Sequence, residues 1–186
     1  MQQNKIITDT KKLLDLYNGG AVFCAFDTET TGLNSSLDHV IEIGAIRFNK
    51  DGVIDTYNEL INPCCVIPYQ ATIVNNITNE MLKDCPLINQ VLPDFMTYIN
   101  GTILVAHNAG FDLKFVNKEL ERCGLNIMKN FATDTLKLSK SIFPLFKSHK
   151  LQDLAISFNI KALQAHRAQD DARVCMEVFI KCLNAL

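Results

Sequence analysis

The chain lacks several features that would set it apart from ordinary globular proteins. It contains no run of about 18 apolar residues, which excludes a membrane-spanning helix of the usual length. Its first 20 residues lack the basic start, apolar segment and small-residue cleavage site of a secretory signal. Repeats, low-complexity segments and linkers are also missing. The 186 residues therefore predict one domain with a sizeable core, located in the cytoplasm and without a membrane partner.

Cysteine spacing excludes two further classes of protein. The seven cysteines are scattered and form no Cys-x-x-Cys pair, so neither a disulfide framework nor a structural zinc site is indicated. Cys24 lies in an apolar segment, and Cys175 and Cys182 are seven residues apart on one face of a predicted helix. We interpret these thiols as reduced and as small hydrophobic residues of the core.

The apolar pattern of the chain predicts a mixed α/β fold. Short apolar runs predict strands, and an Asp51-Gly52 turn joins the second strand to an antiparallel third. A helical crossover makes the first and fourth strands parallel neighbours. The predicted five-stranded sheet has the order 3-2-1-4-5, with strand 2 antiparallel and helices on both faces. The expected strands are 21–27, 40–48, 51–63, 102–108 and 131–135, and the expected helices are 69–74, 78–82, 87–99, one beginning near 109, 135–142, 149–158 and 168–184.

The domain organisation follows from the same pattern. Residues 1–20 are expected to form a helical N-terminal extension, and residues 21–186 the domain itself. Sheets of this kind place their sites at the carboxyl ends of the central parallel strands. Polar residues near the ends of the first and fourth strands are therefore the first candidates for a functional site.

Four carboxylates and a histidine lie in three short stretches of this kind. Asp27 and Glu29 occur in FDTETTGL, Asp112 in HNAGFD, and His166 and Asp171 in HRAQDDA. The period-two geometry of a strand puts Asp27 and Glu29 on one face. Two acidic side chains this close repel each other unless a cation lies between them. Carboxylate oxygens are the ligands that hard cations such as Mg²⁺ prefer, so the stretches predict a metal site.

Each stretch also has a purely structural explanation when taken alone. Asp27 and Glu29 suit a solvated strand end, and Asp112 suits the positive end of a helix dipole. A histidine before a helix, such as His166, is most often an ordinary polar surface residue. The functional interpretation depends on all three stretches meeting at one edge of the predicted sheet.

The flanking residues extend these stretches into a recognisable set. DTETTGL followed by IEIGA, then LVAHNAGFD, then HRAQDDA resembles the motifs of the DEDDh exonucleases in order and spacing, over residues 21–184. The similarity is closest to the proofreading type, found as the epsilon subunit of bacterial DNA polymerase III and as a segment built into some replicative polymerases. DTLKLSKSIFPLFKSHKLQDLAISFNI resembles the latter in particular. The resemblance implies a ribonuclease H-like fold, two Mg²⁺ or Mn²⁺ ions, and release of mononucleotides from 3′ ends.

Position by position, the resemblance assigns the ligands and the base. It implies that the metal is held by carboxylates and that His166 is the general base, a role that suits a group titrating near neutrality. A histidine followed five residues later by a ligand selects Asp171, which leaves Asp170 a role at the surface or at the helix start. The implied ligands are Asp27, Glu29, Asp112 and Asp171.

The resemblance also implies contacts with the terminal nucleotide. The turn after the first two ligands, with Thr30, Thr31 and Leu33, is expected to offer backbone groups and an apolar wedge. Asn108 and Phe111 are expected in the same pocket, although a core role suits Phe111 equally well. Asn76 stands where the family often has glycine.

Two side chains near these stretches suggest supporting roles. Asp134 is expected to cap the following helix and His107 to shape the site by hydrogen bonding. Asn76 tolerates positive φ better than most residues, so the backbone at that position is expected to be kept.

Net charge bears on the substrate. The chain carries −2, whereas nucleic-acid-binding domains are usually basic on one face. Neutralising the four implied ligands with metal would change this balance to +2, and the cations would themselves attract phosphates. We therefore expect modest affinity for a single-stranded or frayed DNA 3′ end. The expected process is proofreading or repair, and a replicative polymerase subunit is a candidate partner.

Two alternatives remain open from the sequence. The motifs leave the sugar unspecified, so an RNA 3′ to 5′ exonuclease of the ribonuclease T or oligoribonuclease type also fits. An inactive module that binds a polymerase is the other alternative. It is disfavoured because all five implied positions are filled.

Overall fold

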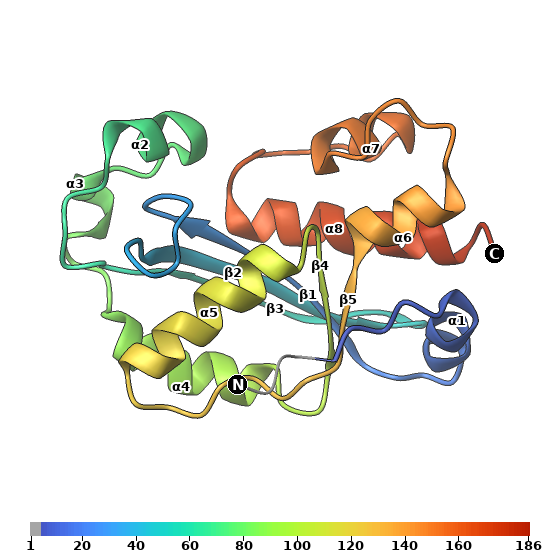
Figure 1. Cartoon of the computed structure of the whole chain (residues 1–186), viewed down its shortest axis with the longest axis horizontal. Helices are drawn as coiled ribbons and strands as arrows, with labels where there is room; N and C mark the ends of the chain where they lie inside the picture. The colour runs from blue at the N-terminus through green and yellow to red at the C-terminus, as the bar shows by residue number, and fades with distance from the viewer. Residues whose placement is uncertain (1–4) are drawn as a thin grey trace.

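A five-stranded mixed sheet organises the chain. The computed structural model describes residues 5–186, and its strands lie in the order β3-β2-β1-β4-β5 (Figure 1). β1 is antiparallel to β2 and parallel to β4, β2 is antiparallel to β3, and β4 is parallel to β5. The predicted order and directions are confirmed. The strands are β1 (Phe23–Thr30), β2 (Val40–Asn49), β3 (Gly52–Leu60), β4 (Ile103–Ala106) and β5 (Ala132–Asp134).

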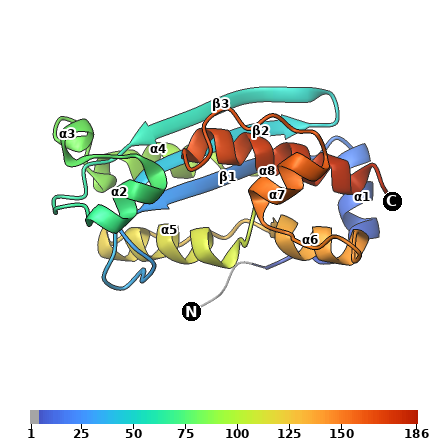
Figure 2. The ribbon, with the colours of Figure 1, turned by 90° about the horizontal axis from the view of Figure 1, so that it is seen from above.

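Helices cover both faces of the sheet (Figures 1 and 2). Each helix predicted from the periodicity is present, with its ends shifted by a few residues at most. No helix among residues 5–186 has the length and apolar character needed to cross a membrane. The helices are α1 (Thr10–Asn18), α2 (Tyr69–Asn75), α3 (Asn79–Leu82), α4 (Ile88–Tyr98), α5 (Gly110–Arg122), α6 (Thr135–Ile142), α7 (Leu151–Ser157) and α8 (Ala168–Leu183).

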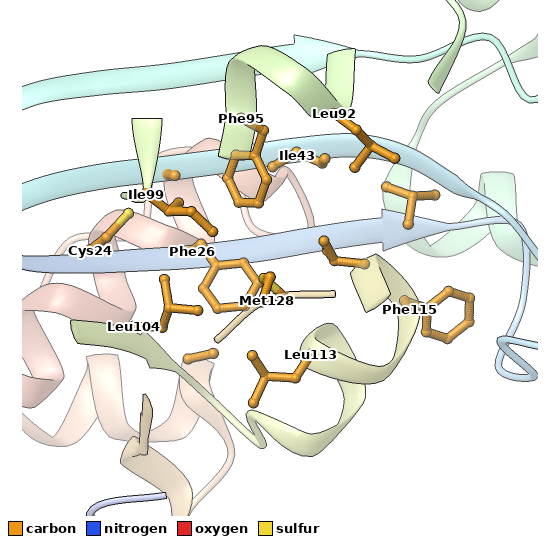
Figure 3. Packing of buried hydrophobic residues seen from close by; sticks show 14 of the residues in the cluster. Cys24, Phe26, Ile43, Leu92, Phe95, Ile99, Leu104, Leu113, Phe115 and Met128 are labelled. Atoms are coloured by element: carbon orange, nitrogen blue, oxygen red, sulfur yellow. The ribbon is translucent and has the colours of Figure 1, made fainter. Parts of the chain in front are cut away.

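The alternation of side chains along β1 divides the core into two layers. Cys24 and Phe26 face α4 and α5, where Phe26 packs beside Phe95 with ring centroids 6.2 Å apart (Figure 3). Phe23 and Ala25 face the other layer, which α8 fills. The same period of two continues into the polar end of β1, so it decides which layer each polar side chain joins.

Helix α8 approaches the sheet closely at Gly44 of β2. A Cβ atom built at Gly44 would lie 2.2 Å from the carbonyl carbon of Ala168 and 2.2 Å from the nitrogen of Gln169. No side chain fits in that space. The glycine therefore allows the first turn of α8 to rest directly on the strand beside β1.

The residues before β1 pack against the same layer. Asp9 accepts a hydrogen bond from Lys12 N and caps α1, whose Leu13 is buried beside α8. Ile7 N donates to the carbonyl of Ala132 in β5. Residues 5–18 are thus joined to the sheet in the structure, and a domain boundary at residue 20 remains a prediction.

All seven cysteines are free thiols. Cys24, Cys175 and Cys182 are buried in the core, as predicted. Cys64 and Cys65 are exposed, because residues 62–68 form an irregular segment between β3 and α2.

Candidate active site

The end of β1 carries the first two carboxylates. The strand runs to Thr30, three residues past the predicted end at Asp27, whereas its parallel pairing with β4 stops at Ala25. Asp27 and Glu29 therefore lie on a part of β1 that extends beyond its parallel neighbour. They continue the alternation of Phe23 and Ala25 and face the layer that contains α8.

Helix α8 supplies the third carboxylate. Asp171 lies in its first turn, and one oxygen from each of Asp27, Glu29 and Asp171 lies within 4.8 Å of the others. Gln152 Nε2 of α7 donates to Asp171 Oδ1 at 2.7 Å, and His166 N donates to Asp171 Oδ2 at 3.2 Å. Two donors thus orient the Asp171 carboxylate toward the end of β1.

Asp112 approaches from the opposite layer. It lies in the first turn of α5, and its Oδ1 accepts hydrogen bonds from Thr28 N at 3.0 Å and Thr28 Oγ1 at 2.8 Å. Thr28 has the opposite parity to Asp27 and Glu29, so it faces α5. These hydrogen bonds hold Asp112 beside the other three carboxylates, although it is not among the residues whose oxygens lie within 4.8 Å of one another.

Burial raises the pKa values of all four carboxylates, and repulsion between them adds to the rise for Asp27 and Glu29. Burial, followed by the charges of Asp112 and Asp171, raises the pKa of Asp27 well above its ordinary value. The pKa of Glu29 rises to about 8, chiefly through burial and then through Asp171. Burial raises the pKa of Asp112 to about 7, although hydrogen bonds from Thr28 oppose the rise. Ionisation of the whole cluster would therefore leave negative charge that the surrounding protein does not neutralise.

The donor set fits hard divalent cations. Among residues 5–186, no lysine or arginine forms a salt bridge with Asp27, Glu29, Asp112 or Asp171. Carboxylate oxygens that converge without a protein cation suit Mg²⁺ or Mn²⁺. A cation at this point would stabilise the ionised carboxylates, which burial disfavours in all four residues.

His166 lies at the edge of the cluster. Its side chain is exposed, and its backbone adopts the left-handed conformation with φ 61°. The hydrogen bond from its backbone nitrogen to Asp171 keeps it beside the carboxylates. Left-handed backbone is uncommon outside glycine, so neighbouring contacts must stabilise this conformation.

Asp170 departs from the sequence-based expectation in one respect. It is only 9% exposed, so the predicted surface position is wrong, whereas the alternative role at the helix start is confirmed. Its Oδ2 accepts hydrogen bonds from Leu163 N and Gln164 N, because residues 161–167 fold back over the first turn of α8. Burial of this kind depends on the path of a loop, which local periodicity does not reveal.

The residues expected to contact the nucleotide surround the same end of β1. Thr30 is buried and donates from Oγ1 to the carbonyl of Gly32 at 2.6 Å, whereas Leu33 is 87% exposed. Phe111 is half-buried and packs on Phe115 with ring centroids 4.7 Å apart, so it has the core contact considered for it. Asn76 has φ 58° at the end of α2, in line with its predicted tolerance of positive φ.

Asp134 links two structural features near the site. Its Oδ1 accepts from Leu136 N at 3.0 Å, which confirms the predicted cap of α6, and from Asn108 N at 3.1 Å. Asn108 has φ 63°, so this contact supports a strained turn between β4 and α5. His107 Nδ1 bonds to Thr135 Oγ1 at 2.8 Å, as expected for a residue that shapes the turn.

Four supporting residues were not predicted from the sequence. Glu42 is fully buried on β2, and its position as a single charge within the apolar VIEIGA segment was an available signal. Asn75 hydrogen-bonds to Glu29 from the end of α2, and no pattern in the sequence distinguishes it from Asn76. The other two are Gln152, which contacts Asp171, and Arg167, which pairs with Glu42.

Comparisons with known proteins identify the family of this chain and several relatives. The model of the family described as Exonuclease (RNase_T) matches residues 24–179. DNA polymerase III subunit epsilon of Treponema pallidum (strain Nichols) is 45% identical over 159 residues, which cover 84% of this chain and 74% of that protein. DNA polymerase III PolC-type of Caldanaerobacter subterraneus subsp. tengcongensis is 42% identical over 88% of this chain, which spans only 12% of that much longer protein.

A solved structure is similar over nearly the whole domain. Exonuclease X in complex with 5′ overhanging duplex DNA has a TM-score of 0.71 and 26% identity, and the match covers 87% of this chain and 91% of that chain. The similarity therefore includes both layers of helices as well as the sheet.

Proposed function

This chain belongs to the exonuclease family, and from that premise we propose that it hydrolyses phosphodiester bonds at DNA 3′ ends, in proofreading or repair. The observation that carries the proposal is the convergence of Asp27, Glu29 and Asp171 within 4.8 Å, with Asp112 fastened to Thr28 beside them. DNA is preferred as substrate because the similar exonuclease X was solved with duplex DNA and the 45% identical relative is a DNA polymerase subunit.

The four carboxylates would hold two Mg²⁺ or Mn²⁺ ions. When bound, divalent cations activate the attacking water and stabilise the charge of the departing 3′ oxygen. Gln152 orients Asp171 for this role, and Asn75 does the same for Glu29. Both supporting donors come from helices on the two sides of the β1 end.

His166 takes the proton of the attacking water in this proposal. Its exposed side chain is accessible to substrate, and its backbone is held to Asp171. Leu33 and Phe111 contact the terminal nucleotide, since an exposed apolar side chain and a half-buried aromatic ring can pack against a sugar and a base. Thr30 and Asn108 complete the pocket through the turns that they stabilise.

The test is digestion of a 5′-labelled single-stranded DNA oligonucleotide in the presence of Mg²⁺. We expect stepwise shortening from the 3′ end, and Asp27→Ala should lower kcat at least about a hundredfold because a ligand is lost. Asp51→Ala is the matched control, since it removes an exposed aspartate at the β2–β3 turn. Full activity of Asp27→Ala would refute the site, and internal cleavage products would refute the 3′-end reaction.

A matched RNA oligonucleotide tests the choice of nucleic acid. The proposal expects faster shortening of DNA than of RNA of the same sequence, measured as kcat/KM. Degradation of RNA alone would favour the ribonuclease T or oligoribonuclease type. Absence of cleavage of both substrates with Mg²⁺ and with Mn²⁺ would favour an inactive polymerase-binding module.

A replicative polymerase subunit is the proposed partner. The support is the match that spans 74% of a polymerase III epsilon subunit. Co-purification of the native gene product with a polymerase subunit from its own cells tests this proposal. Recovery of the protein without any polymerase subunit would contradict it.

A further inference from the structure

The loop that carries His166 is fastened at its start by Asp170. We define the His166 loop as residues 161–167, which join the C-terminal side of α7 to α8. Asp170 Oδ2 accepts from Leu163 N at 2.6 Å and from Gln164 N at 2.7 Å. Its Oδ1 accepts from Arg173 Nε at 3.0 Å and Nη2 at 2.7 Å. Arg173 Nη2 also donates to the carbonyl of Lys161 at 2.6 Å, so one ion pair contacts the loop at three points.

The end of the loop is fastened to the sheet. Arg167 donates to the carboxylate of Glu42 through Nε at 3.0 Å and Nη2 at 2.8 Å, and Ala168 N donates to the same carboxylate at 3.1 Å. Glu42 is fully buried on β2 and pairs in register with Glu29 of β1. The end of the loop is thereby tied to the strand that lies beside the carboxylate cluster.

His166 lies between these two attachments. Its side chain is exposed, so its direction is set chiefly by the backbone of the loop. That backbone is left-handed at His166 and donates to Asp171 Oδ2 at 3.2 Å. Loss of either attachment would allow the backbone to relax to an unstrained conformation and turn the imidazole away.

Asp170 is unsuited to be a further metal ligand. Adjacent residues on a helix point about 100° apart, so Asp170 is directed away from the cluster that Asp171 joins. Four donors from the loop and from Arg173 already occupy its two oxygens. Its hydrogen bonds instead hold the loop that carries His166.

We propose that Asp170 is a positioning residue, which acts on the reaction through His166 by holding residues 161–167 in place. The inference rests on the proposed function, in which His166 is the base. Glu42 and Arg167 have the same role at the other end of the loop. Displacement of a catalytic group by about 1 Å can lower a rate by up to about a hundredfold, so loop anchors of this kind can control kcat.

A double-mutant cycle on the complete chain tests the proposal. Asp170→Ala should lower kcat about tenfold on the 5′-labelled DNA oligonucleotide while KM changes less than about twofold. In the His166→Ala background the same change should lower kcat no further, because the group on which Asp170 acts is already missing. An equal loss in both backgrounds, or no loss in the parent chain, would overturn the proposal.

Two further variants separate positioning from stability. Glu177→Ala is the matched control, because it removes another carboxylate partner of Arg173 on α8 without a contact to the loop, and kcat should be unchanged. Asp170→Asn retains an oxygen for Leu163 N and Gln164 N and should recover most of the activity lost in Asp170→Ala, whether or not Asp170→Ala folds well. Loss in Asp170→Asn as large as in Asp170→Ala would overturn the role of these two hydrogen bonds.

The same measurements distinguish failure of the proposed function from failure of the positioning role. A parent chain without exonuclease activity would refute the function itself. A fully active His166→Ala variant would refute the histidine as base and the positioning role together. An active parent chain with an impaired His166→Ala variant and additive effects of Asp170→Ala would refute the positioning role alone.

Discussion

Two adjacent aspartates show how strongly the environment of a single residue decides its chemistry. Burial raises the pKa of Asp171, which joins the carboxylate cluster. Burial also acts to raise the pKa of Asp170, but hydrogen bonds from Gln164 N, Arg173 and Leu163 N outweigh it and bring the pKa below its ordinary value. One residue is thereby left with unneutralised charge that suits a cation, whereas the other is fully engaged in holding a loop.

The raised pKa of Glu29 predicts how metal-free protein responds to pH. Its pKa rises from 4.5 to about 8 in the folded state, so the folded protein binds this proton more tightly than the unfolded chain does. The stabilising effect is complete below pH 4.5 and is lost as pH rises toward about 8. Thermal denaturation in EDTA should therefore give a Tm that falls over this range.

Glu29→Gln supplies the control for that measurement. The amide cannot ionise, so the decline in Tm between pH 4.5 and about 8 should be smaller than in the parent chain. The pKa values of the other three carboxylates are also raised, so part of the decline in Tm should remain in this variant. These residues are Asp27, Asp112 and Asp171. A parent Tm that rises with pH across this range would contradict the prediction.

Individual elements bring the functional residues together through their packing. β1 directs Asp27 and Glu29 toward α8 and Thr28 toward α5, so one strand brings together carboxylates from both layers. Helix α5 also fixes the turn after β1. Arg122 donates to the carbonyls of Ser35 and Asp38, and the buried Glu119 bonds to Arg122 and His39. The exposed Leu33 therefore belongs to a turn that is attached to a helix.

The contact between α8 and β2 predicts the effect of Gly44→Ala. The added methyl group would lie 2.2 Å from the backbone of Ala168, so the first turn of α8 must move away from the sheet. We expect a loss of about 2 kcal/mol or more in the free energy of unfolding, as for overpacked cores. The shift would also displace Asp171, so kcat should fall. Denaturant unfolding and oligonucleotide digestion measure the two effects.

Gly110→Ala is the control for the stability effect. A Cβ atom at Gly110 meets no atom within 4 Å, and the residue lies at the start of α5. Alanine should leave stability unchanged or raise it by up to about 1 kcal/mol, because it favours helix more than glycine does. Equal destabilisation by both substitutions would contradict steric overlap at Gly44 as the cause.

For the molecule as a whole, the balance of charge links metal binding to folding. The four carboxylates repel one another in the folded state, and the net charge of −2 gives no general positive field to offset them. Cations that bind only the folded cluster would stabilise the entire domain by mass action.

That linkage predicts a metal-dependent Tm. At about 100 times Kd, Mg²⁺ or Mn²⁺ should raise the free energy of unfolding by about 2.7 kcal/mol and the Tm by roughly 5 to 10 °C. Differential scanning fluorimetry at pH 8 measures the shift. Asp27→Asn should reduce it strongly, whereas Asp51→Asn, at the exposed turn, should retain it. An equal shift in both variants would indicate that the ions bind elsewhere.

The pattern along the chain was sufficient to predict the strand order, the helices and the three stretches that supply the carboxylates. These properties follow from periods of 2 and 3.6 residues and from local motifs, which a linear sequence contains in full. The resemblance to the exonuclease family, in which a histidine is followed five residues later by a ligand, separated Asp171 from Asp170. The length of β1 beyond Asp27 was not predictable in this way, because pairing with β2 extends the strand past its apolar residues.

Only the packing of distant segments decided the rest. The attachment of Asn75 to Glu29, of Glu42 to Arg167 and of Asp170 to residues 163–164 depends on contacts between elements that are placed by the core. Polar residues of this kind leave no periodic signal, since their partners are chosen by the path of loops and by the close approach of α8 at Gly44. The chemistry of the site was thus local in the sequence, whereas the support that orients it was a property of the folded chain.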